Sequence, residues 1–262
     1  MDRMIYTALS GAQQSLERQS VVTNNLANVS TTGFKAQLSA FRAVPIQGDG
    51  LATRAVVADT TPGFDASPGM INETGRSLDV AIDGDGWLAV DDGGGSEAYT
   101  RDGRLRMDST GLLMADGKPV LGEGGPIVLP LNAKVSVASD GTISALGLGD
   151  QPNTLAEVGR LKLVNPGNDS MQRGDDGLYR AKAGIADNNG NNVNGGEDDA
   201  PARLPRNDAV RLVSGALEGS NVSATEAMVS MIDNARRFEM NMKMIQTADD
   251  NEQRANQLLS LT

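Results

Sequence analysis

The sequence predicts an α+β protein in which discontinuous, coiled-coil-like helices near the two chain ends accompany a central all-β domain of the sandwich or barrel type. Apolar residues near both ends recur every three or four positions, which is the spacing of one helix face. The middle carries short β-type runs that stop at turns about every ten residues, as antiparallel sandwiches and barrels do. We therefore divide the 262 residues into terminal helical segments (1–34 and 218–262), an extended connector with short β-pieces (35–76) and a β-rich domain (77–217).

The first helix is predicted over residues 3–28. Its apolar positions, separated by polar residues, are Ile5, Ala8, Leu9, Ala12, Leu16, Val22 and Leu26. The stretch from Asn28 to Gly33, rich in Ser and Thr, ends this helix. The connector that follows has no sustained period and is interrupted by Pro and Gly, so we expect only short strands in it, one of them at Thr53–Val57.

In the β-rich domain, the alternating run Leu78–Ile82 meets the turn Gly84-Asp85-Gly86, after which Trp87–Val90 resumes. Similar runs follow at 112–114, 120–121, 127–129, 135–137, 143–145 and 161–164. Residues 184–208 are mostly Asn, Gly and acidic residues with little to bury, so we expect a surface loop there.

The last helix is predicted over residues 224–262. It begins with the capping box Ser223-Ala224-Thr225-Glu226, contains no Pro or Gly, and would be about 55 Å long at ~1.5 Å per residue. Its stripe steps by about 3.4 residues on average, close to the period of a coiled coil, with Glu252 interrupting it. The stripe residues are Met228, Met231, Ala235, Phe238, Met242, Ile245, Ala248, Ala255 and Leu259.

A helix with one narrow apolar stripe is only marginally stable alone in water, so both stripes need partners. Several stripe residues are Ala, which bury little area, so a two-helix hairpin gains little against the entropy of ordering its backbone. We therefore expect terminal helices that fray in the monomer and become ordered when many copies pack together. The pattern alone also allows an ordinary helical pair that covers its own β-domain.

Composition narrows the possible function classes. The chain has no Cys and no His, which removes thiolate chemistry and the commonest general base and metal ligand. Residues 1–42 carry +2 and residues 224–262 carry −2, so the middle holds the whole net charge of −11, which argues against nucleic-acid binding. No apolar run reaches the ~20 residues of a membrane span, and the beginning of the chain lacks the pattern of a cleaved signal peptide.

Two motifs resemble the bacterial flagellar rod and hook proteins. Asn24 to Lys35 (NNLANVSTTGFK) resembles the N-terminal signature of that family, and Glu218 to Val222 (EGSNV) resembles its C-terminal motif. The middle is similar at 78–90, 99–103 and 122–127, so the resemblance covers essentially the full chain. Within the family, Phe41–Pro45, Leu78–Ala81 and Asn234–Met240 are most similar to the proximal-rod members, and the distal-rod members are the nearest alternative.

The resemblance implies a structural subunit of the flagellar basal-body rod rather than an enzyme, with no cofactor or metal. It implies export through the flagellar type III apparatus without a cleaved signal peptide. In the periplasm, such a protein assembles with itself and with other proximal- and distal-rod subunits into a hollow shaft that transmits torque. The terminal helices form the inner tube and the β-domain lies outside, with no nucleic acid and no direct membrane insertion. The alternatives are a distal-rod or hook-type protein of the same family and, less readily, a secreted β-rich adhesin.

The expected assembly interface combines apolar helix residues that pack within and between subunits with Asn residues that bond the backbone where the first helix ends. Phe34 is expected to anchor the turn that follows. The full set is Ile5, Leu9, Leu16, Val22, Asn24, Asn25, Leu26, Asn28, Phe34, Met228, Met231, Phe238, Met242, Ile245 and Leu259.

Three other patterns have simpler explanations. Gly84-Asp85-Gly86 with Ala89 fits a loose dinucleotide fingerprint, but that motif needs a helix next, and we expect a hairpin. Residues 187–194 lack the central Gly and closing Glu of a calcium loop. Asp83, Asp85, Asp91 and Asp92 include a conceivable glycosidase acid pair, but we interpret them as charged turns.

Overall fold

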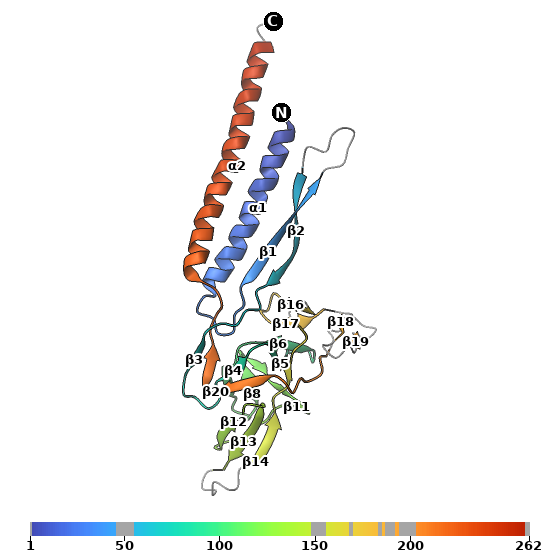
Figure 1. Ribbon diagram of the computed structural model, residues 1–262, viewed down its shortest axis with the longest axis vertical. Helices are drawn as coiled ribbons and strands as arrows, with labels where there is room; N and C mark the ends of the chain where they lie inside the picture. The colour runs from blue at the N-terminus through green and yellow to red at the C-terminus, as the bar shows by residue number, and fades with distance from the viewer. Residues whose placement is uncertain are drawn as a thin grey trace. The chain divides into compact units, whose positions relative to one another are not determined.

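The computed structural model describes residues 2–45, 55–147, 156–167, 170–182, 185–186, 192–193 and 203–259. The chain forms two compact units, which Figure 1 shows as ribbons. The helical unit comprises residues 1–29, 36–65 and 222–262, and the β unit comprises residues 30–35 and 66–221. The first unit holds both long helices and the second holds most of the strands, which confirms the predicted α+β class.

Two antiparallel helices lie side by side in the helical unit, α1 (Asp2–Ala27) and α2 (Ala224–Leu259). Both begin within one residue of the predicted positions. Ser223 caps α2, since its Oγ accepts a hydrogen bond from the N–H of Glu226 at 3.4 Å. α1 ends in a turn where the N–H of Asn28 donates to the carbonyl of Asn24 at 3.2 Å. The long C-terminal helix predicted over 224–262 is therefore present as far as residue 259, with residues 260–262 outside the described part.

The connector contains longer strands than the sequence predicts. β1 (Gln37–Pro45) and β2 (Ala55–Phe64) form an antiparallel hairpin that contacts α1. Thr53 lies outside the described residues, while Val57 pairs with Ala43. The register shifts between Leu38 and Ala40, opposite Pro62, and a bulge of this kind accommodates a proline that cannot donate to the ladder. Pro45 and Pro62 interrupt the alternation of apolar residues that would have revealed these strands. They lie at a strand end and at a bulge.

The β unit is built from short strands. They are β3 (Ile71–Glu73), β4 (Val80–Asp83), β5 (Trp87–Asp91), β6 (Glu97–Thr100), β7 (Leu105–Met107), β8 (Leu113–Ala115), β9 (Lys118–Pro119), β10 (Leu121–Gly122), β11 (Gly125–Pro126), β12 (Lys134–Val137), β13 (Thr142–Leu146), β14 (Ala156–Arg160), β15 (Leu163–Val164), β16 (Met171–Arg173), β17 (Tyr179–Ala181), β18 (Ile185–Ala186), β19 (Asn192–Val193), β20 (Arg211–Ser214) and β21 (Ala216–Glu218). The largest sheet has the antiparallel order β15-β5-β6-β17-β16. The described strands form separate small sheets, and none of these closes into a barrel.

The core of the β unit follows the predicted alternation. In β13, Ile143 and Ala145 are buried between half-buried neighbours. β5 and β6 are buried along almost their whole length, as expected for strands inside the largest sheet. Trp87 and Tyr99 are among the largest fully buried side chains there. These strands contribute much of the hydrophobic core of the β unit.

The structure tests two of the strand predictions made for the β unit. β5 follows the Gly84-Asp85-Gly86 turn and pairs with β6, so the predicted hairpin is confirmed and no helix follows as the dinucleotide fingerprint requires. Residues 127–129, expected as a strand, contribute only the isolated bridge of Val128 with Leu112, because Pro126 and Pro130 flank them. Of the discounted calcium loop at 187–194, only residues 192–193 are described.

Candidate assembly site

The two helices pack through a seam of small and polar side chains. Its most buried members are Ala8, Ala12 and Ser15 on α1 and Ala227, Asn234 and Ala248 on α2. Half-buried residues continue the two rows: Ile5, Gln19, Val22 and Leu26 on α1, and Met231, Phe238, Asn241, Ile245 and Ala255 on α2. Successive seam positions are alternately three and four residues apart, broken only at Glu252, which gives the ~3.5-residue period of a left-handed coiled coil.

The predicted interface residues of the helices divide between this seam and the outer surface. Six of them occupy half-buried seam positions: Ile5, Val22, Leu26, Met231, Phe238 and Ile245. Four others are exposed, namely Leu9 (44%), Leu16 (57%), Met228 (53%) and Met242 (38%). The side chain of Leu259 lies outside the described part of the chain. A single subunit therefore leaves four of these apolar side chains uncovered.

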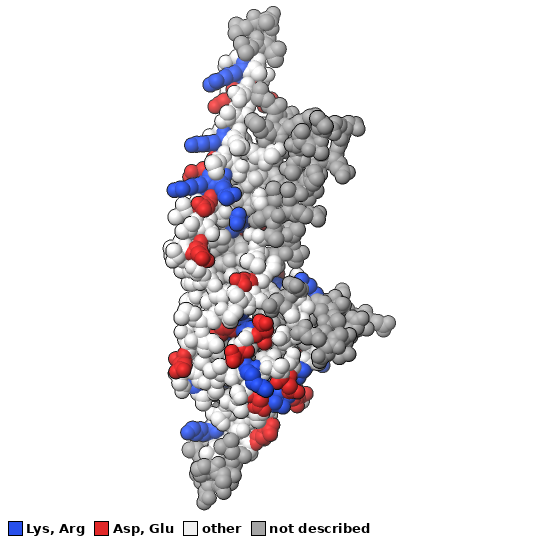
Figure 2. All heavy atoms as spheres, viewed as in Figure 1, with Lys and Arg blue, Asp and Glu red and all other residues white. Residues whose placement is uncertain are grey.

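More large apolar side chains accompany these four on the outer surface of the helices. They are Tyr6 on α1 and Val229, Ile232, Met240 and Met244 on α2. Figure 2 shows charged side chains along one edge of α2, with uncharged surface beside them. Monomeric soluble proteins seldom expose so many large apolar groups together, and such surfaces mark protein–protein contacts.

Sequence reasoning missed the polar part of the seam. It placed Met228, Ala235 and Met242 in the stripe, whereas the structure places their neighbours Ala227, Asn234 and Asn241 there. The periodicity was read from apolar residues, so Asn positions were passed over in favour of neighbouring Met positions. The available signal was a small side chain at every seventh position, since residues 227, 234, 241, 248 and 255 are Ala, Asn, Asn, Ala and Ala.

The Asn residues at the end of α1 bond the backbone. Asn25 makes two bonds to Gln37, with Nδ2 donating to its carbonyl at 3.0 Å and Oδ1 accepting from its N–H at 2.8 Å. Nδ2 of Asn28 donates to the carbonyl of Asn24 at 2.9 Å, and the Asn24 side chain is exposed. These bonds fix the chain between the end of α1 and the start of β1.

The β unit contains a buried ion cluster that sequence reasoning did not foresee. The carboxylate of Glu218 lies 2.7 Å from Nζ of Lys35 and 2.8 Å from Nη1 of Arg101, and all three side chains are at most 2% exposed. The N–H of Gly69 also donates to Glu218 Oε1 at 2.8 Å, and Lys35 Nζ donates to the carbonyl of Ser67 at 2.7 Å. Four segments far apart in the sequence thus meet at one carboxylate.

The segment before Lys35 is fitted tightly into the β unit. Gly33 has a φ of 68°, and a Cβ atom there would lie 2.4 Å from the carbonyl carbon of Arg101, so only glycine fits. Its N–H donates to the carbonyl of Glu218 at 2.8 Å. Phe34 is buried, with the guanidinium of Arg173 4.7 Å from its ring centre. Phe34 therefore packs in the β unit and not in the helix seam.

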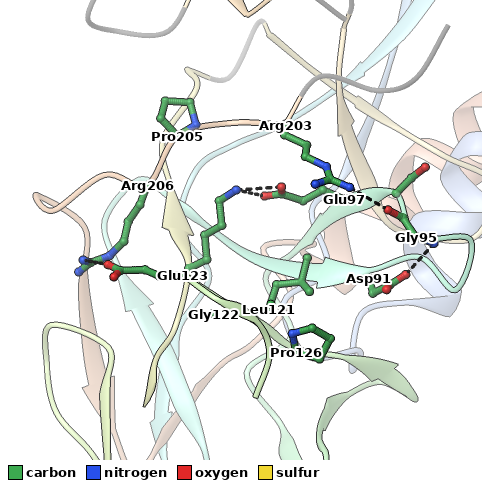
Figure 3. Close-up of a pocket in the computed structure, with 13 residues that line it drawn as sticks. Asp91, Gly95, Glu97, Leu121, Gly122, Glu123, Pro126, Arg203, Pro205 and Arg206 are labelled. Carbon is green, nitrogen blue, oxygen red and sulfur yellow. Dashed lines mark hydrogen bonds and ion pairs between the residues drawn. The ribbon is translucent and has the colours of Figure 1, made fainter. Parts of the chain in front are cut away.

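A cleft of about 480 Å³ lies elsewhere in the β unit (Figure 3). Its cationic lining groups bond to protein oxygens: Lys162 lies 2.7 Å from Glu97, Arg206 pairs with Glu123, and Arg203 donates to the carbonyl of Gly95 at 3.2 Å. We assign it no ligand because each of these three cationic side chains already pairs with a protein oxygen.

The acidic residues of two turns in the β unit are exposed or accept hydrogen bonds from the backbone. Asp83 and Asp85 are exposed, and Asp91 accepts bonds from the N–H groups of Gly93 and Gly95 at 2.8 and 3.2 Å. The N–H of Gly94 holds the pKa of Asp92 below its ordinary value, whereas a general acid needs a raised pKa. Asp91 and Asp92 thus act as acceptors for the backbone of their own turn.

No helix among the described residues is both long and apolar enough to cross a membrane. In the same part of the chain, no three acidic side chains gather in a way that could hold a metal ion.

Comparison with known proteins places the chain among flagellar proteins. Residues 5–35 match a family described as flagella basal body rod protein, residues 81–145 match the flagellar hook protein FlgE/F/G D1 domain, and residues 213–258 match the flagellar basal body rod FlgEFG protein C-terminal family. The chain is 52% identical, over the full length of both chains, to the flagellar basal-body rod protein FlgF of Salmonella typhimurium and to that of Escherichia coli. The chain belongs to the FlgF-type flagellar basal-body rod proteins. The rod protein FlgG of Bacillus subtilis is 33% identical over 95% of this chain and 96% of its own length.

Membership in the rod family confirms the resemblance inferred from the two terminal motifs. The first matched region contains the segment from Asn24 to Lys35, and the third contains Glu218 to Val222 and most of α2. The 52% identity to FlgF of Salmonella typhimurium and Escherichia coli, against 33% to FlgG of Bacillus subtilis, agrees with the proximal-rod similarity. The ion cluster of this rod protein joins the same two motifs, since Lys35 closes the first and Glu218 opens the second.

Proposed function

We propose that the chain is a structural, non-catalytic subunit of the flagellar basal-body rod that polymerises through α1 and α2. The observation that carries the proposal is the set of exposed apolar side chains on these helices, in a chain that belongs to the rod family. Family membership favours a rod subunit over an adhesin. A distal-rod role is the second candidate because FlgG is also a relative.

In the proposed polymer, the interface residues form two groups, one with contacts within a subunit and one with contacts between subunits. Residues of the seam, such as Phe238 and Ile245, pack α1 against α2 within one subunit, while Leu9, Leu16, Met228 and Met242 contact helices of neighbouring copies. Burial of these side chains stabilises the polymer by roughly 25 cal/mol per Å² of apolar surface. The terminal segments 1–34 and 218–262 would thus form the tube, with the domain at 77–217 outside it and the connector at 35–76 between them.

In a shaft that transmits torque, the ion cluster would carry load between the helices and the β unit. Lys35 follows α1 by eight residues and Glu218 precedes α2 by six. Because both bind within the β unit, the two chain segments that lead to the helices are tied to one buried carboxylate. A load on the helices would then reach the β unit through buried charge-assisted bonds as well as through the backbone.

The family resemblance is also the basis for the proposed cellular location and partners of the protein. We propose export through the flagellar type III apparatus without a cleaved signal peptide, followed by assembly in the periplasm with itself and with other proximal- and distal-rod subunits. The low stability expected of the small-residue seam suits a chain that must pass through an export channel unfolded.

A charge in the seam tests the proposal. Phe238→Asp should block rod assembly and motility in a strain that lacks the wild-type copy, because the carboxylate cannot be buried between helices. Gln246→Asp, at an exposed position of the same helix, is the control and should assemble. The thermal unfolding of the β unit should be the same in both variants. Normal motility with Phe238→Asp would contradict polymerisation through the helices.

A further inference from the structure

Nine large apolar side chains of the two helices are exposed among the described residues, and six of them share one face of the helical pair. Each of the six directly follows a seam residue, as Leu9 follows Ala8 and Met242 follows Asn241. Successive helix residues are turned by about 100°, and in an antiparallel pair the same turn leads to the same side of both helices. The six residues, which we call the open face, are Tyr6, Leu9, Leu16, Met228, Ile232 and Met242.

The β1–β2 hairpin does not cover the open face. It contacts α1 on the other side, where Asn25 makes its two bonds to Gln37 of β1. Gln13, Ser20 and Thr23, which also follow seam residues of α1, are exposed like the apolar residues beside them. The open face is therefore available to another molecule.

The contact between Gly11 and Asn241 fixes the level of one helix against the other, since a Cβ atom on Gly11 would lie 3.0 to 3.2 Å from the Asn241 side chain. Levels along the pair are counted from this contact in opposite directions, at about 1.5 Å per residue. The apolar part of the open face then runs from the level of Leu9 to that of Met228, a length of about 22 Å.

The other three exposed apolar side chains lie on α2 away from the seam. We call Val229, Met240 and Met244 the ridge. It is also about 22 Å long at 1.5 Å per residue. The exposed residues Arg236 and Arg237 project on either side of it, because consecutive helix residues are turned by about 100°. These arginines belong to the charged edge of α2, part of which Figure 2 shows.

An exposed glutamate stands at each border of the open face. Glu239 on α2 directly follows a seam residue, and Glu17 on α1 lies one residue beyond Leu16. When two copies stand parallel at the same height, the two ridge arginines of one copy lie within about 5 Å, along the helix axis, of the two glutamates of the other. Asp233, which interrupts the ridge, is then level with Ser20, whose hydroxyl can donate to it. The two surfaces thus match in length and in charge.

We propose that the open face of one copy binds the ridge of a neighbouring copy of this chain, with both copies parallel and at the same height. Apolar side chains meet over the shared length, and the two ridge arginines pair with Glu17 and Glu239. This pairing rests on the proposed rod function and names the surfaces that meet in it. The open face and the ridge point in different directions, so the contact is heterologous and continues into a ring or a helical polymer, whereas a two-fold contact would stop at a dimer.

Disulfide trapping tests the pairing in full-length chains, which contain no native Cys. Leu9→Cys on the open face and Met244→Cys on the ridge lie at nearly the same level. The two variants, one of them tagged, are expressed as separate chains in a strain that lacks the wild-type copy, and isolated rods are oxidised. We expect a covalent dimer of the two variants. As the control, Asn251→Cys lies one heptad, about 10.5 Å, beyond Met244 on the same side of α2 and should give several-fold less dimer with Leu9→Cys.

Equal yields from the two pairs, or no mixed dimer in rods that contain both variants, would overturn the pairing. If the Cys variants do not assemble, charge reversal decides the question. Arg236→Glu with Arg237→Glu should reduce motility several-fold, and adding Glu17→Arg and Glu239→Arg should restore most of it. Motility that is not reduced, or not rescued, would also overturn the pairing. A mixed dimer in the purified protein together with rods that lack this chain would contradict the rod function and support the pairing of the two surfaces.

Discussion

Replacing Glu218 by Gln removes the carboxylate that Lys35 and Arg101 share in the ion cluster. Both cations are at most 2% exposed, so the change leaves two buried positive charges beside a neutral amide. Gln has nearly the same shape as Glu and can still accept the bond from the N–H of Gly69. The perturbation is therefore one of charge, with packing almost unchanged.

The expected loss of stability is large. Removing one partner of a buried ion pair costs about 3–5 kcal/mol. For a folded unit of this size, each kcal/mol shifts the Tm by roughly 2–4 °C, so Glu218→Gln should lower the Tm of the β unit by about 6–20 °C. Glu123 pairs with Arg206 but is 57% exposed, and Glu123→Gln should cost only about 0–1 kcal/mol.

The fluorescence of Trp87 reports this transition selectively. It is the only Trp of the chain, it is buried in the β unit, and its ring centre lies 5.5 Å from the guanidinium of Arg101. Thermal unfolding followed at this residue compares Glu218→Gln with Glu123→Gln. Equal Tm values for the two variants would refute the claim that buried charge pairing holds the two terminal motifs in the β unit.

Other substitutions and treatments test separate contacts. Gly33→Ala forces a Cβ against the backbone of Arg101 and should lower the same Tm by several degrees, and an unchanged Tm would show that the close approach is not needed. The N–H and hydroxyl of Thr142, together with Arg160, hold the pKa of Asp140 below its usual value, so its stabilising effect is present above about pH 4 and is lost as the pH falls through the folded-state pKa. Asp140→Asn should therefore lower the Tm at neutral pH and flatten its decline in acid, and a parallel pH profile would contradict this assignment. Limited proteolysis of the monomer should remove about 30–40 residues from each end before it cleaves the β unit, whereas a resistant full-length chain would show that the helices are ordered without partners.

The helices could be predicted from the sequence because their information is local. Apolar spacing, the Ser223 cap and the absence of Pro and Gly fix α2 within a few residues. Which face becomes the seam was harder to predict. Neighbouring residues such as Met228 and Ala227 compete for it, and close packing of two helices selects the smaller one.

The ion cluster could not be predicted because its partners are distant in sequence. Lys35 and Glu218 are 183 residues apart, and neither has a local pattern that indicates burial. Lys and Glu are usually exposed, so a single sequence favours the surface for both. The β1–β2 hairpin was missed for a different reason, since Pro62 and Gly63 interrupt the alternation that normally reveals a strand.

The measurement that tests polymerisation through the helices most directly is maleimide labelling of Leu16→Cys, a position on the exposed face of α1. The labelling rate is compared between the purified monomer and assembled rods, and denatured protein gives the full value. Labelling should be rapid in the monomer and strongly slowed in the rod, because helices of neighbouring copies cover this position there. Equal rates in monomer and rod would contradict assembly through this face.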